Sequence, residues 1–281
     1  MTVDMPSISD IVPSFRLDGR IAVVTGGSGG MASVLNKALL AQGASVALVD
    51  IDQAAVDKAA VELTNWATYN NVEISTNDVK KISSWECDVT NYDQITEVVN
   101  KIAEFHKETP DLLIHTAGFC NNYDALDYPP DKMKSLVNVN LLGSLYFPQV
   151  MAKLLVKFSK PGSFILIGSM SGVIVNYPQN QVAYNASKAG VIHAVKSLAT
   201  EWAKYKIRVN CLSPGYILTP LTKKVIGENI EMKNAWESRI PMNRMADPKE
   251  FVGSILYLAN QDASSYTTGE NLVVDGGYQC W

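Results

Sequence analysis

The 281-residue sequence predicts one α/β domain built on a doubly wound parallel sheet of seven strands. Two observations lead to this fold class. Short runs rich in β-branched residues alternate along the chain with longer segments of helical periodicity, and a glycine-rich turn follows the first run. Because apolar strands separated by helices form parallel sheets that are covered on both faces, we expect a Rossmann arrangement.

The strands are the short apolar runs, and the helices are the longer periodic segments between them. The strands are predicted over Arg20–Thr25, Ser45–Asp50, Ile82–Cys87, Leu112–Thr116, Ser163–Gly168, Arg208–Leu212 and Asn271–Val274. The helices are predicted over Met31–Gln42, Gln53–Thr68, Asn91–Lys107, Asp131–Phe158, Gln181–Lys204 and Pro248–Asn260. A long irregular stretch, 214–247, precedes the last helix, and a substrate lid is expected there.

No linker or repeat divides the chain, so residues 17–281 are expected to form the domain and residues 1–16 an N-terminal arm. The arm lacks the basic and apolar regions of a signal peptide, and no long uninterrupted apolar run predicts a membrane span. The net charge of −4 is spread along the chain, which argues against a nucleic-acid partner. Four separated cysteines and three scattered histidines predict a cytoplasmic protein with reduced thiols and no metal site.

The glycine-rich turn after the first strand predicts a nucleotide site. It runs from Thr25 to Met31 and places Gly26, Ser28 and Gly30 at the start of a helix. Glycines there allow a pyrophosphate to approach the backbone and rest on the helix N-terminus. The alternative is an ordinary strand-to-helix turn, and the position directly after the first strand favours the nucleotide site.

Asp50 at the end of the second strand predicts which nicotinamide cofactor binds. A carboxylate at this position accepts hydrogen bonds from the adenosine ribose and repels a 2′-phosphate. The next residues are Ile51 and Asp52, neither of which is a cation that would receive the phosphate. NAD is therefore expected rather than NADP. The alternative role for Asp50 is an N-cap of the following helix.

Tyr184 and Lys188 predict a proton-transfer site. They are four residues apart in a helical segment, so their side chains lie on one face. A nearby ammonium favours the phenolate and is expected to lower the pKa of the tyrosine from about 10. Such a tyrosine would serve as a general base or acid toward an alcohol or a ketone. The alternative is an exposed ring beside a solvated lysine.

Further motifs follow the strand ends or lie in the adjoining helix. They are Cys87-Asp88-Val89, Thr116-Ala117-Gly118, Asn138-Val139-Asn140, Gly168-Ser169-Met170-Ser171-Gly172 and Ser213-Pro214-Gly215-Tyr216-Ile217-Leu218-Thr219. Together with the glycine turn and the Tyr184/Lys188 pair, they make the chain resemble the classical short-chain dehydrogenase/reductases from about Leu17 to Trp281. The resemblance implies an enzyme that passes hydride between a CH–OH group and a nicotinamide.

The resemblance also implies a role for each matching residue. Tyr184 would transfer the proton, Lys188 would lower its pKa and hold the nicotinamide ribose, and Asn140 would support a water-linked relay. Asp88 and Val89 would bracket the adenine, and the carboxamide would bind at Ile217 and Thr219. The implied cofactor site consists of Gly26, Ser28, Gly30, Met31, Asp50, Asp88, Val89, Ala117, Gly118, Tyr184, Lys188, Pro214, Gly215, Ile217 and Thr219.

Two serines compete for the role of holding the substrate oxygen. Counting forward from the end of the fifth strand selects Ser169, whereas the family's usual thirteen-residue count back from Tyr184 selects Ser171. We favour Ser169 as catalytic, because the intervening segment is two residues longer than usual, and expect both serines and Tyr184 to face the substrate. This sequence departs from the family's Asn-Asn-Ala-Gly run, because His115 and Thr116 stand in place of the two asparagines before Ala117. His115 is expected to be a strand residue packed in the core.

Within this family, runs such as Leu166–Gly172 and Val274–Tyr278 are similar to those of yeast polyol dehydrogenases. The similarity implies oxidation of a polyol to a ketose, first of all D-arabinitol to D-ribulose, and a homotetramer joined through its long helices. The alternatives are an NADPH-dependent sorbose or carbonyl reductase of the same family, and a non-catalytic nucleotide sensor. Polar side chains able to bind sugar hydroxyls are expected near the site at Asn121, Asn122, Asn176, Gln179 and Gln181.

Overall fold

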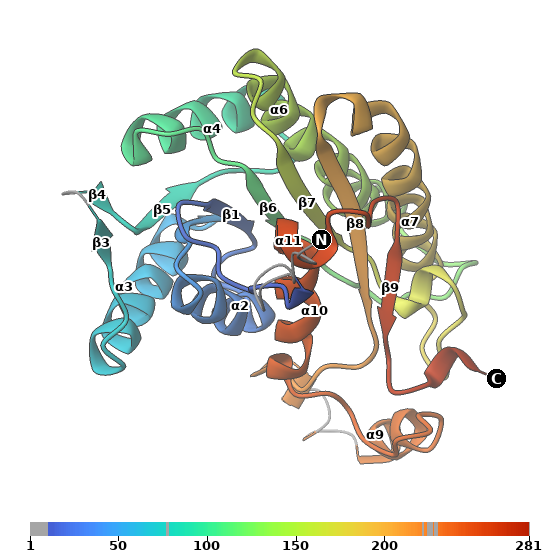
Figure 1. The fold of residues 1–281 in the computed structure, drawn as a ribbon. Coiled ribbons are helices and arrows are strands. Elements are labelled where there is room, and N and C mark those ends of the chain that lie inside the picture. The colour runs from blue at the N-terminus through green and yellow to red at the C-terminus, as the bar shows by residue number, and fades with distance from the viewer. Residues whose placement is uncertain (1–10, 77–78, 221, 224–226, 228–229, 281) are drawn as a thin grey trace, which may run out of the picture.

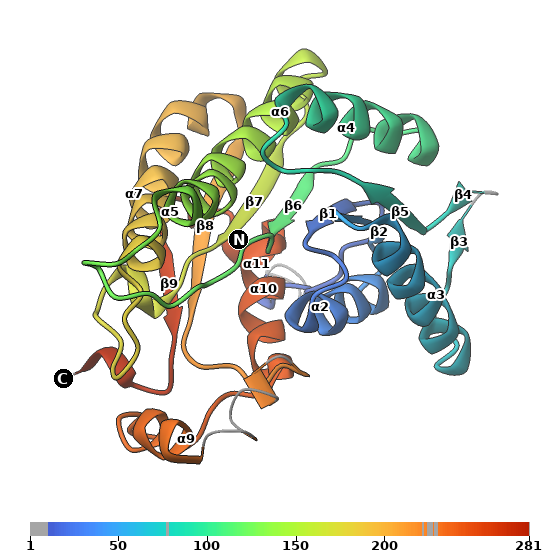
Figure 2. The ribbon, with the colours of Figure 1, turned by 180° about the vertical axis from the view of Figure 1, so that it is seen from behind.

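The computed structural model describes residues 11–76, 79–220, 222–223, 227 and 230–280. Residues 1–10 of the expected arm and Trp281 lie outside this set. A parallel sheet crosses the middle of the molecule, and helices cover both of its faces (Figure 1). The view from behind shows the same three layers, with α6 and α4 above the sheet and α2 and α10 below it (Figure 2).

Seven strands form the main sheet in the order β5-β2-β1-β6-β7-β8-β9, and every neighbouring pair is parallel. The strands are β1 (Ile21–Thr25), β2 (Ser45–Asp50), β5 (Ile82–Glu86), β6 (Leu112–His115), β7 (Gly162–Ile167), β8 (Ile207–Pro214) and β9 (Asn271–Val274). The predicted doubly wound sheet is therefore confirmed. The strand order reverses between β1 and β6, and this is the switch point where open α/β sheets bind ligands.

Two layers of helices bury the two faces of the sheet. On one face lie α4 (Tyr92–His106), α6 (Gly143–Lys157) and α7 (Val182–Trp202), and on the other lie α2 (Gly30–Ala41), α3 (Gln53–Tyr69) and α10 (Val252–Ala259). Side chains alternate between the faces, so in β1 Val23 packs in the first cluster and Val24 in the second. All five β1 side chains are buried, as expected for a central strand of a parallel sheet.

Several elements were not predicted from the sequence. They are the hairpin of β3 (Ser75–Thr76) and β4 (Val79–Lys80), helices α9 (Ile230–Glu237) and α11 (Gln261–Ser264), and the short turns η2 (Met170–Gly172) and η5 (Tyr278–Cys280). The helix predicted over Pro248–Asn260 begins as the short turn η4 (Pro248–Phe251), and the short turn η3 (Ala203–Tyr205) ends the one predicted over Gln181–Lys204. The helix predicted over 131–158 is instead divided into α5 (Pro130–Val137), a π-helical turn η1 (Asn138–Leu142) and α6. Short elements such as these carry too few residues to show a period.

The run 130–157 is long and apolar enough to cross a membrane by length and composition alone. Half of its most apolar window is buried inside the molecule, where α6 packs against the sheet. The remaining apolar side chains of α6 include Val156, which is exposed.

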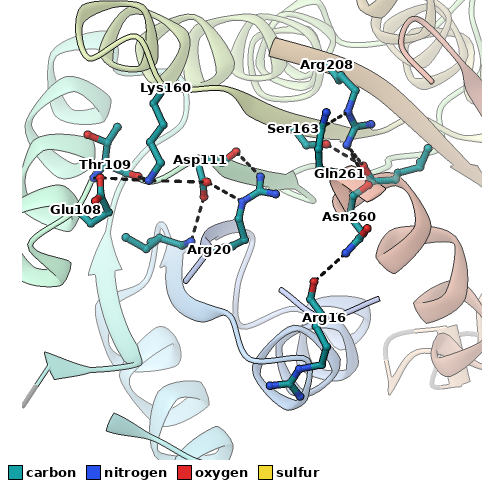
Figure 3. A network of polar contacts seen from close by, with 12 residues as sticks. Arg16, Arg20, Glu108, Thr109, Asp111, Lys160, Ser163, Arg208, Asn260 and Gln261 are labelled. Atoms are coloured by element: carbon teal, nitrogen blue, oxygen red, sulfur yellow. Dashed lines mark hydrogen bonds and ion pairs between the residues drawn. The ribbon is translucent and has the colours of Figure 1, made fainter. Parts of the chain in front are cut away.

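Polar side chains fasten the amino ends of the strands, at the sheet edge opposite the switch point (Figure 3). Asp111 precedes β6 and accepts hydrogen bonds from Arg20 Nε (2.6 Å) and from the Ile21 amide (3.1 Å). Lys160 lies 3.2 Å from a Glu108 oxygen and donates to the Thr109 carbonyl. These contacts tie the start of β1 to the start of β6 and to the turn after α6.

Arg208 is the centre of a second cluster of hydrogen bonds, also near the amino ends of the strands. It is 6% exposed and donates to the carbonyl oxygens of Leu258 (3.0 Å), Asn260 (3.4 Å) and Thr267 (3.1 Å), and to Gln261 Oε1. Burial lowers the pKa of the guanidinium to about 10, which leaves it protonated at neutral pH. Two of these carbonyls lie at the end of α10, where a cation is favoured by the helix dipole.

Replacing Arg208 with methionine is expected to lower the free energy of unfolding by about 2–4 kcal/mol. The variant keeps most of the buried volume but removes four hydrogen bonds, two to the end of α10, one to Gln261 of α11 and one to the Thr267 carbonyl. Urea denaturation followed by circular dichroism measures the difference. The matched control is Lys58→Met on the exposed face of α3, whose only described ion pair, with Glu62, spans 3.9 Å and should be worth less than about 0.5 kcal/mol.

Candidate active site

The site lies at the carboxyl edge of the sheet, around the switch point between β1 and β6. The turn after β1 and the segment after β6 approach closely there. A Cβ placed on Gly26, whose φ is +62°, would lie 3.0 Å from both the Ala117 amide nitrogen and Thr116 Oγ1. Only glycine combines this left-handed backbone with the absence of a side chain, so Gly26 permits the crevice to form.

The glycine turn leads directly into α2. Gly29 is the N-cap of α2 and has no side chain to satisfy the first amides of the helix, so those amides remain available to an anion. Met31 is partly buried in the first turn, and a Cβ on Gly30 would lie 3.0 Å from Pro220 and 3.2 Å from Thr219. The turn after β1 and the loop after β8 thus form two sides of one cradle with a helix N-terminus at its base.

Asp50 lies at the end of β2 and is joined to the glycine turn. Its Oδ2 accepts hydrogen bonds from the Ser28 amide (3.1 Å) and the Ser28 hydroxyl (2.5 Å), and its Oδ1 accepts one from the Ile51 amide. The N-cap of α3 is Asp52, which accepts from the Ala55 amide at 3.1 Å. The alternative role for Asp50, as that N-cap, is therefore wrong, and its carboxylate faces the cradle.

The remaining residues assigned to the cofactor follow the ends of neighbouring strands. Asp88 Oδ1 accepts from the Thr90 amide and hydroxyl, each at 2.8 Å, and Val89 packs against Gly143 at the start of α6. A Cβ on Gly118 would lie 3.1 Å from Asn140 Oδ1 and 3.6 Å from Lys188 Nζ. The cradle therefore reaches directly to the predicted catalytic residues.

The loop after β8 closes the other side of the cradle. Pro214 ends β8, and a Cβ on Gly215 would lie 2.7 Å from Asp275 Cα, so this loop passes close to the segment after β9. Ile217 forms an isolated bridge with Ala246, and the Thr219 amide donates to the Ile217 carbonyl at 2.9 Å. These contacts hold Ile217 and Thr219 beside the glycine turn.

Helix α7 places Tyr184 and Lys188 on one face, as the four-residue spacing predicts. Lys188 Nζ lies 5.8 Å from the centre of the Tyr184 ring and donates to the Ile167 carbonyl at the end of β7 (2.7 Å). Lys188 is 5% exposed. The alternative of a solvated lysine beside an exposed ring is therefore wrong.

Asn140 is positioned by the π-helical turn η1. Its Nδ2 donates to the Phe119 carbonyl (2.8 Å) and to Ser187 Oγ (3.3 Å), while its Oδ1 accepts from the Phe119 amide (3.0 Å). The Asn140 carbonyl accepts from the Ser144 hydroxyl. A π turn inserts a residue into the helical register, and here it aims a fully buried amide at the segment after β6 and at α7.

Ser169 and Ser171 have different surroundings. Ser169 forms a hydrogen bond with Tyr184, and its Oγ accepts from the Ser171 amide at 3.1 Å. Ser171 Oγ instead accepts from Gln181 Nε2 at 3.2 Å. The strands and helices thus bring Asn140, Ser169, Tyr184 and Lys188 together, whereas the Ser171 hydroxyl is engaged by Gln181. This arrangement agrees with the count forward from the end of β7.

The electrostatics of the pair differ from the expectation. Burial raises the pKa of Tyr184 to about 12, and the hydrogen bond with Ser169 opposes this only in part. Burial also lowers the pKa of Lys188 to about 8, so the ammonium is itself costly to maintain. The prediction that the lysine lowers the pKa of this tyrosine is therefore wrong for the protein alone, because the removal of the phenol from water is the largest influence on this pKa.

The departure at His115 and Thr116 is accommodated by Thr25. Thr116 Oγ1 donates to the Thr25 carbonyl (2.6 Å), and His115 Nδ1 lies 2.9 Å from Thr25 Oγ1. His115 is 1% exposed, and burial, with a smaller contribution from Lys188, lowers its pKa to about 3. His115 is thus an uncharged residue of the core, as expected, and Thr116 supplies the contact to β1.

A network of amides and aromatic rings beside the site was missed. Gln181 bonds to Asn176, and both Asn176 and Gln179 donate to Tyr216 Oη, at 3.1 and 2.8 Å. Trp236 of α9 stacks on Tyr216 with ring centres 4.4 Å apart. The sequence predicts that these amides bind sugar hydroxyls. Their hydrogen bonds to one another and to the segment 214–247 join residues far apart in the chain, so no local pattern predicts them.

Comparisons with known proteins agree with this geometry. A family described as enoyl-(acyl carrier protein) reductase matches residues 26–279. The chain is 56% identical to a ribulose-forming D-arabinitol 2-dehydrogenase of Scheffersomyces stipitis, with 98% of this chain and 99% of the relative covered. It is 50% identical to an NADH-dependent L-xylulose reductase of Ambrosiozyma monospora (98% and 100% covered) and 37% identical to a sorbose reductase of Candida albicans (97% and 91%).

A solved structure shows the same fold. The crystal structure of a short-chain type dehydrogenase/reductase from Mycobacterium marinum superposes with a TM-score of 0.82 at 33% sequence identity. The similarity covers 95% of this chain and 98% of that one.

Proposed function

The chain belongs to the short-chain dehydrogenase/reductase family, and on that premise we propose that it is an NAD-dependent polyol dehydrogenase that oxidises D-arabinitol to D-ribulose. The observation that carries the chemistry is the cluster of Asn140, Ser169, Tyr184 and Lys188 beside an anion cradle. The substrate rests on similarity of 50% or more to enzymes named for pentitols and pentuloses. The sorbose reductase is more distant, at 37% identity.

The reaction converts a CH–OH group and NAD⁺ into a ketone, NADH and a proton. The cofactor supplies the hydride acceptor when bound, and the chain supplies the groups that hold the alcohol and remove its proton. Ser169 donates a hydrogen bond to the reacting oxygen, and Tyr184 takes the alcohol proton. Lys188 Nζ lies 5.8 Å from the centre of the Tyr184 ring, and Asn140 bonds to Ser187 on the same helix, so both would support the relay that passes the proton of Tyr184 onward.

Asp50 supports NAD as the cofactor. Its carboxylate lies at the end of β2, on the side of the cradle where an adenosine ribose would lie in a Rossmann fold. A negative charge there opposes a 2′-phosphate, and Ile51 and Asp52 offer no cation in compensation. The Ambrosiozyma monospora relative is likewise an NADH-dependent reductase.

The direct test is a rate comparison across D-arabinitol, xylitol, ribitol, sorbitol and mannitol with NAD and with NADP, read as NADH or NADPH absorbance. We expect D-arabinitol with NAD to give the highest kcat/KM and D-ribulose as product. Silence on every polyol would overturn the proposal. Faster reduction of sorbose with NADPH than any polyol oxidation would favour the reductase alternative.

The two serines are separated by alanine variants. Ser169→Ala is expected to lower kcat for polyol oxidation by about 10²–10³-fold, because the reacting oxygen loses a donor that also contacts Tyr184. Ser171→Ala is expected to keep kcat within about tenfold, since Ser171 bonds to Gln181. Steady-state kinetics on both variants provides the comparison. The reverse order of effects would transfer the catalytic role to Ser171.

The rate is expected to depend on pH in the direction set by Tyr184. Because burial raises the pKa of this phenol, the phenolate that accepts the alcohol proton increases as the pH rises. We expect kcat/KM for polyol oxidation to rise across about pH 6 to 9, while kcat/KM for ketose reduction stays level or falls. Initial rates in both directions measure this, and an oxidation rate that declines over the same range would contradict Tyr184 as the base.

A homotetramer in the cytoplasm completes the proposal. The outer sides of α6 and α7 border a hollow whose apolar and aromatic lining, Leu145, Tyr146, Val156, Leu198, Trp202 and Tyr205, lies beside the polar Gln149, Lys153 and Glu201, and an apolar surface with a polar rim favours association between subunits. The four cysteines are free, which supports a reducing compartment. Light scattering after size-exclusion chromatography determines the state, and a monomer at micromolar concentration would overturn the tetramer.

A further inference from the structure

Gln181 is a buried amide in the wall of the candidate active site. It is 6% exposed, directly precedes α7, and lies three residues before Tyr184. The Tyr184-bearing helix therefore fixes its backbone, and the Asn185 amide donates to its carbonyl at 3.0 Å. The catalytic cluster described above makes no use of this side chain.

The Gln181 amide nitrogen has more acceptors around it than it has protons to donate. Its Nε2 lies 2.8 Å from Asn185 Oδ1, 2.9 Å from Asn176 Oδ1 and 3.2 Å from Ser171 Oγ. An amide nitrogen carries two protons, so three acceptors compete for two donors. The other end, Oε1, faces Cys120 Sγ at 3.8 Å, and a thiol is only a weak donor. This wall of the site thus has spare acceptors that a hydroxyl donor would satisfy.

The orientation of the Gln181 amide is consistent with the network of hydrogen bonds around it. Trp236 Nε1 can only donate, and its bond to Gln179 Oε1 (3.0 Å) leaves Gln179 Nε2 to donate to Tyr216. Asn176 Nδ2 also donates to Tyr216, which turns its Oδ1 toward Gln181 Nε2. Gln181 therefore presents Nε2 to the network and Oε1 to Cys120.

The spare acceptors lie next to the reacting groups. The Ser171 amide donates to Ser169 Oγ (3.1 Å), and Ser169 bonds to Tyr184. Cys120, which faces Gln181 Oε1, is close enough to Tyr184 and Lys188 to influence both electrostatically. A hydroxyl on the carbon adjacent to the one being oxidised would therefore meet Gln181 while the reacting oxygen meets Ser169 and Tyr184.

We propose that Gln181, assisted by Ser171, is the specificity-determining residue that recognises a hydroxyl vicinal to the carbon being oxidised. Gln181 Oε1 accepts a hydrogen bond from that hydroxyl, and the oxygen of the hydroxyl accepts one from Ser171 Oγ. The ligand class is a 1,2-diol within an open-chain polyol. This inference rests on the proposed polyol oxidation and deepens it, because a buried acceptor left unpaired penalises an alcohol that lacks the second hydroxyl.

The test uses two substrates that differ by one hydroxyl, 2,3-butanediol and 2-butanol, with D-arabinitol as the full substrate. We expect the wild type to prefer the diol by about 10²-fold in kcat/KM, and Gln181→Met to reduce that preference to within about threefold. The same variant should lose about 30-fold in kcat/KM on D-arabinitol but bind NADH, followed by fluorescence, as the wild type does. The matched control is the adjacent exposed Asn180→Ala, whose amide contacts Asp124 and which should leave all three rates unchanged.

The outcomes are distinct. A wild type that oxidises polyols, combined with a Gln181→Met variant that keeps the full diol preference, overturns the inference and leaves the proposed function intact. A wild type that oxidises no polyol overturns both. If Gln181→Met fails to fold, Ser171→Ala carries the test, since it leaves the Gln181 amide in place; a reduction of the diol preference by about three- to tenfold supports the subsite, and an unchanged preference contradicts it.

Discussion

Tyr184→Phe is expected to lower kcat for polyol oxidation by about 10³-fold or more. The substitution removes only the phenolic oxygen, so the ring still fills its partly buried position on α7, but no group remains to take the alcohol proton. Initial-rate kinetics with NAD measures the loss. NADH binding followed by fluorescence should change by less than about threefold, because the cradle formed by the glycine turn and Asp50 is untouched.

Tyr146 of α6 provides the matched control. Tyr146→Phe removes a phenolic oxygen from α6, outside the cluster of Asn140, Ser169, Tyr184 and Lys188, and its rate should stay near that of the wild type. Tyr184→Phe activity within tenfold of the wild type would remove Tyr184 from the proton-transfer role. Loss of NADH binding in the same variant would instead show a folding defect, which thermal unfolding with and without NADH would reveal.

Asp50→Ala is expected to narrow the preference for NAD over NADP by about 10²-fold. The variant removes the acceptor for the ribose hydroxyls, so kcat/KM with NAD falls, and it removes the charge that repels a 2′-phosphate, so kcat/KM with NADP rises or holds. It also releases Ser28, whose amide and hydroxyl both bond to Asp50 Oδ2. The ratio of kcat/KM values for the two cofactors, measured with saturating polyol, gives the effect.

The neighbouring carboxylate provides the comparison. Asp52 caps α3 through the Ala55 amide, so Asp52→Ala should cost about 1 kcal/mol of stability and leave the cofactor ratio unchanged. An equal shift of the ratio in both variants would attribute it to the net charge of the region. A wild type that already prefers NADP would refute the role assigned to Asp50.

The sheet was predictable because its strands are short apolar runs that stand apart from polar helical segments. β2 and β9 begin and end where predicted, and the other strands differ by one or two residues at most ends. Asp50 and Gly26 could be placed because each follows a strand end, and parallel strands bring their carboxyl ends to one edge. Tyr184 and Lys188 could be paired because four residues make just over one helical turn.

Other features depend on contacts that no local pattern encodes. The π turn at Asn138–Leu142 inserts one residue into a run whose apolar pattern continues unbroken, so the sequence predicted a single helix. The amide network joins Gln181 to Tyr216 across 35 positions of sequence. The pKa of Tyr184 was predicted in the wrong direction, because the spacing reveals the cation but not the depth of burial.

The hydrogen-bond cluster around Arg208 has a consequence for engineering this enzyme. Arg208 and the Arg20–Asp111 pair secure the amino ends of the strands, while the groups assigned to chemistry all lie at the carboxyl ends. Thermal stability can therefore be changed at the amino ends of the strands, and substrate specificity can be changed separately at the carboxyl ends. Random mutagenesis that is screened for thermal tolerance should accumulate changes near the amino ends of the strands. Libraries that seek activity on new sugars should vary residues around Gln181, at the carboxyl ends.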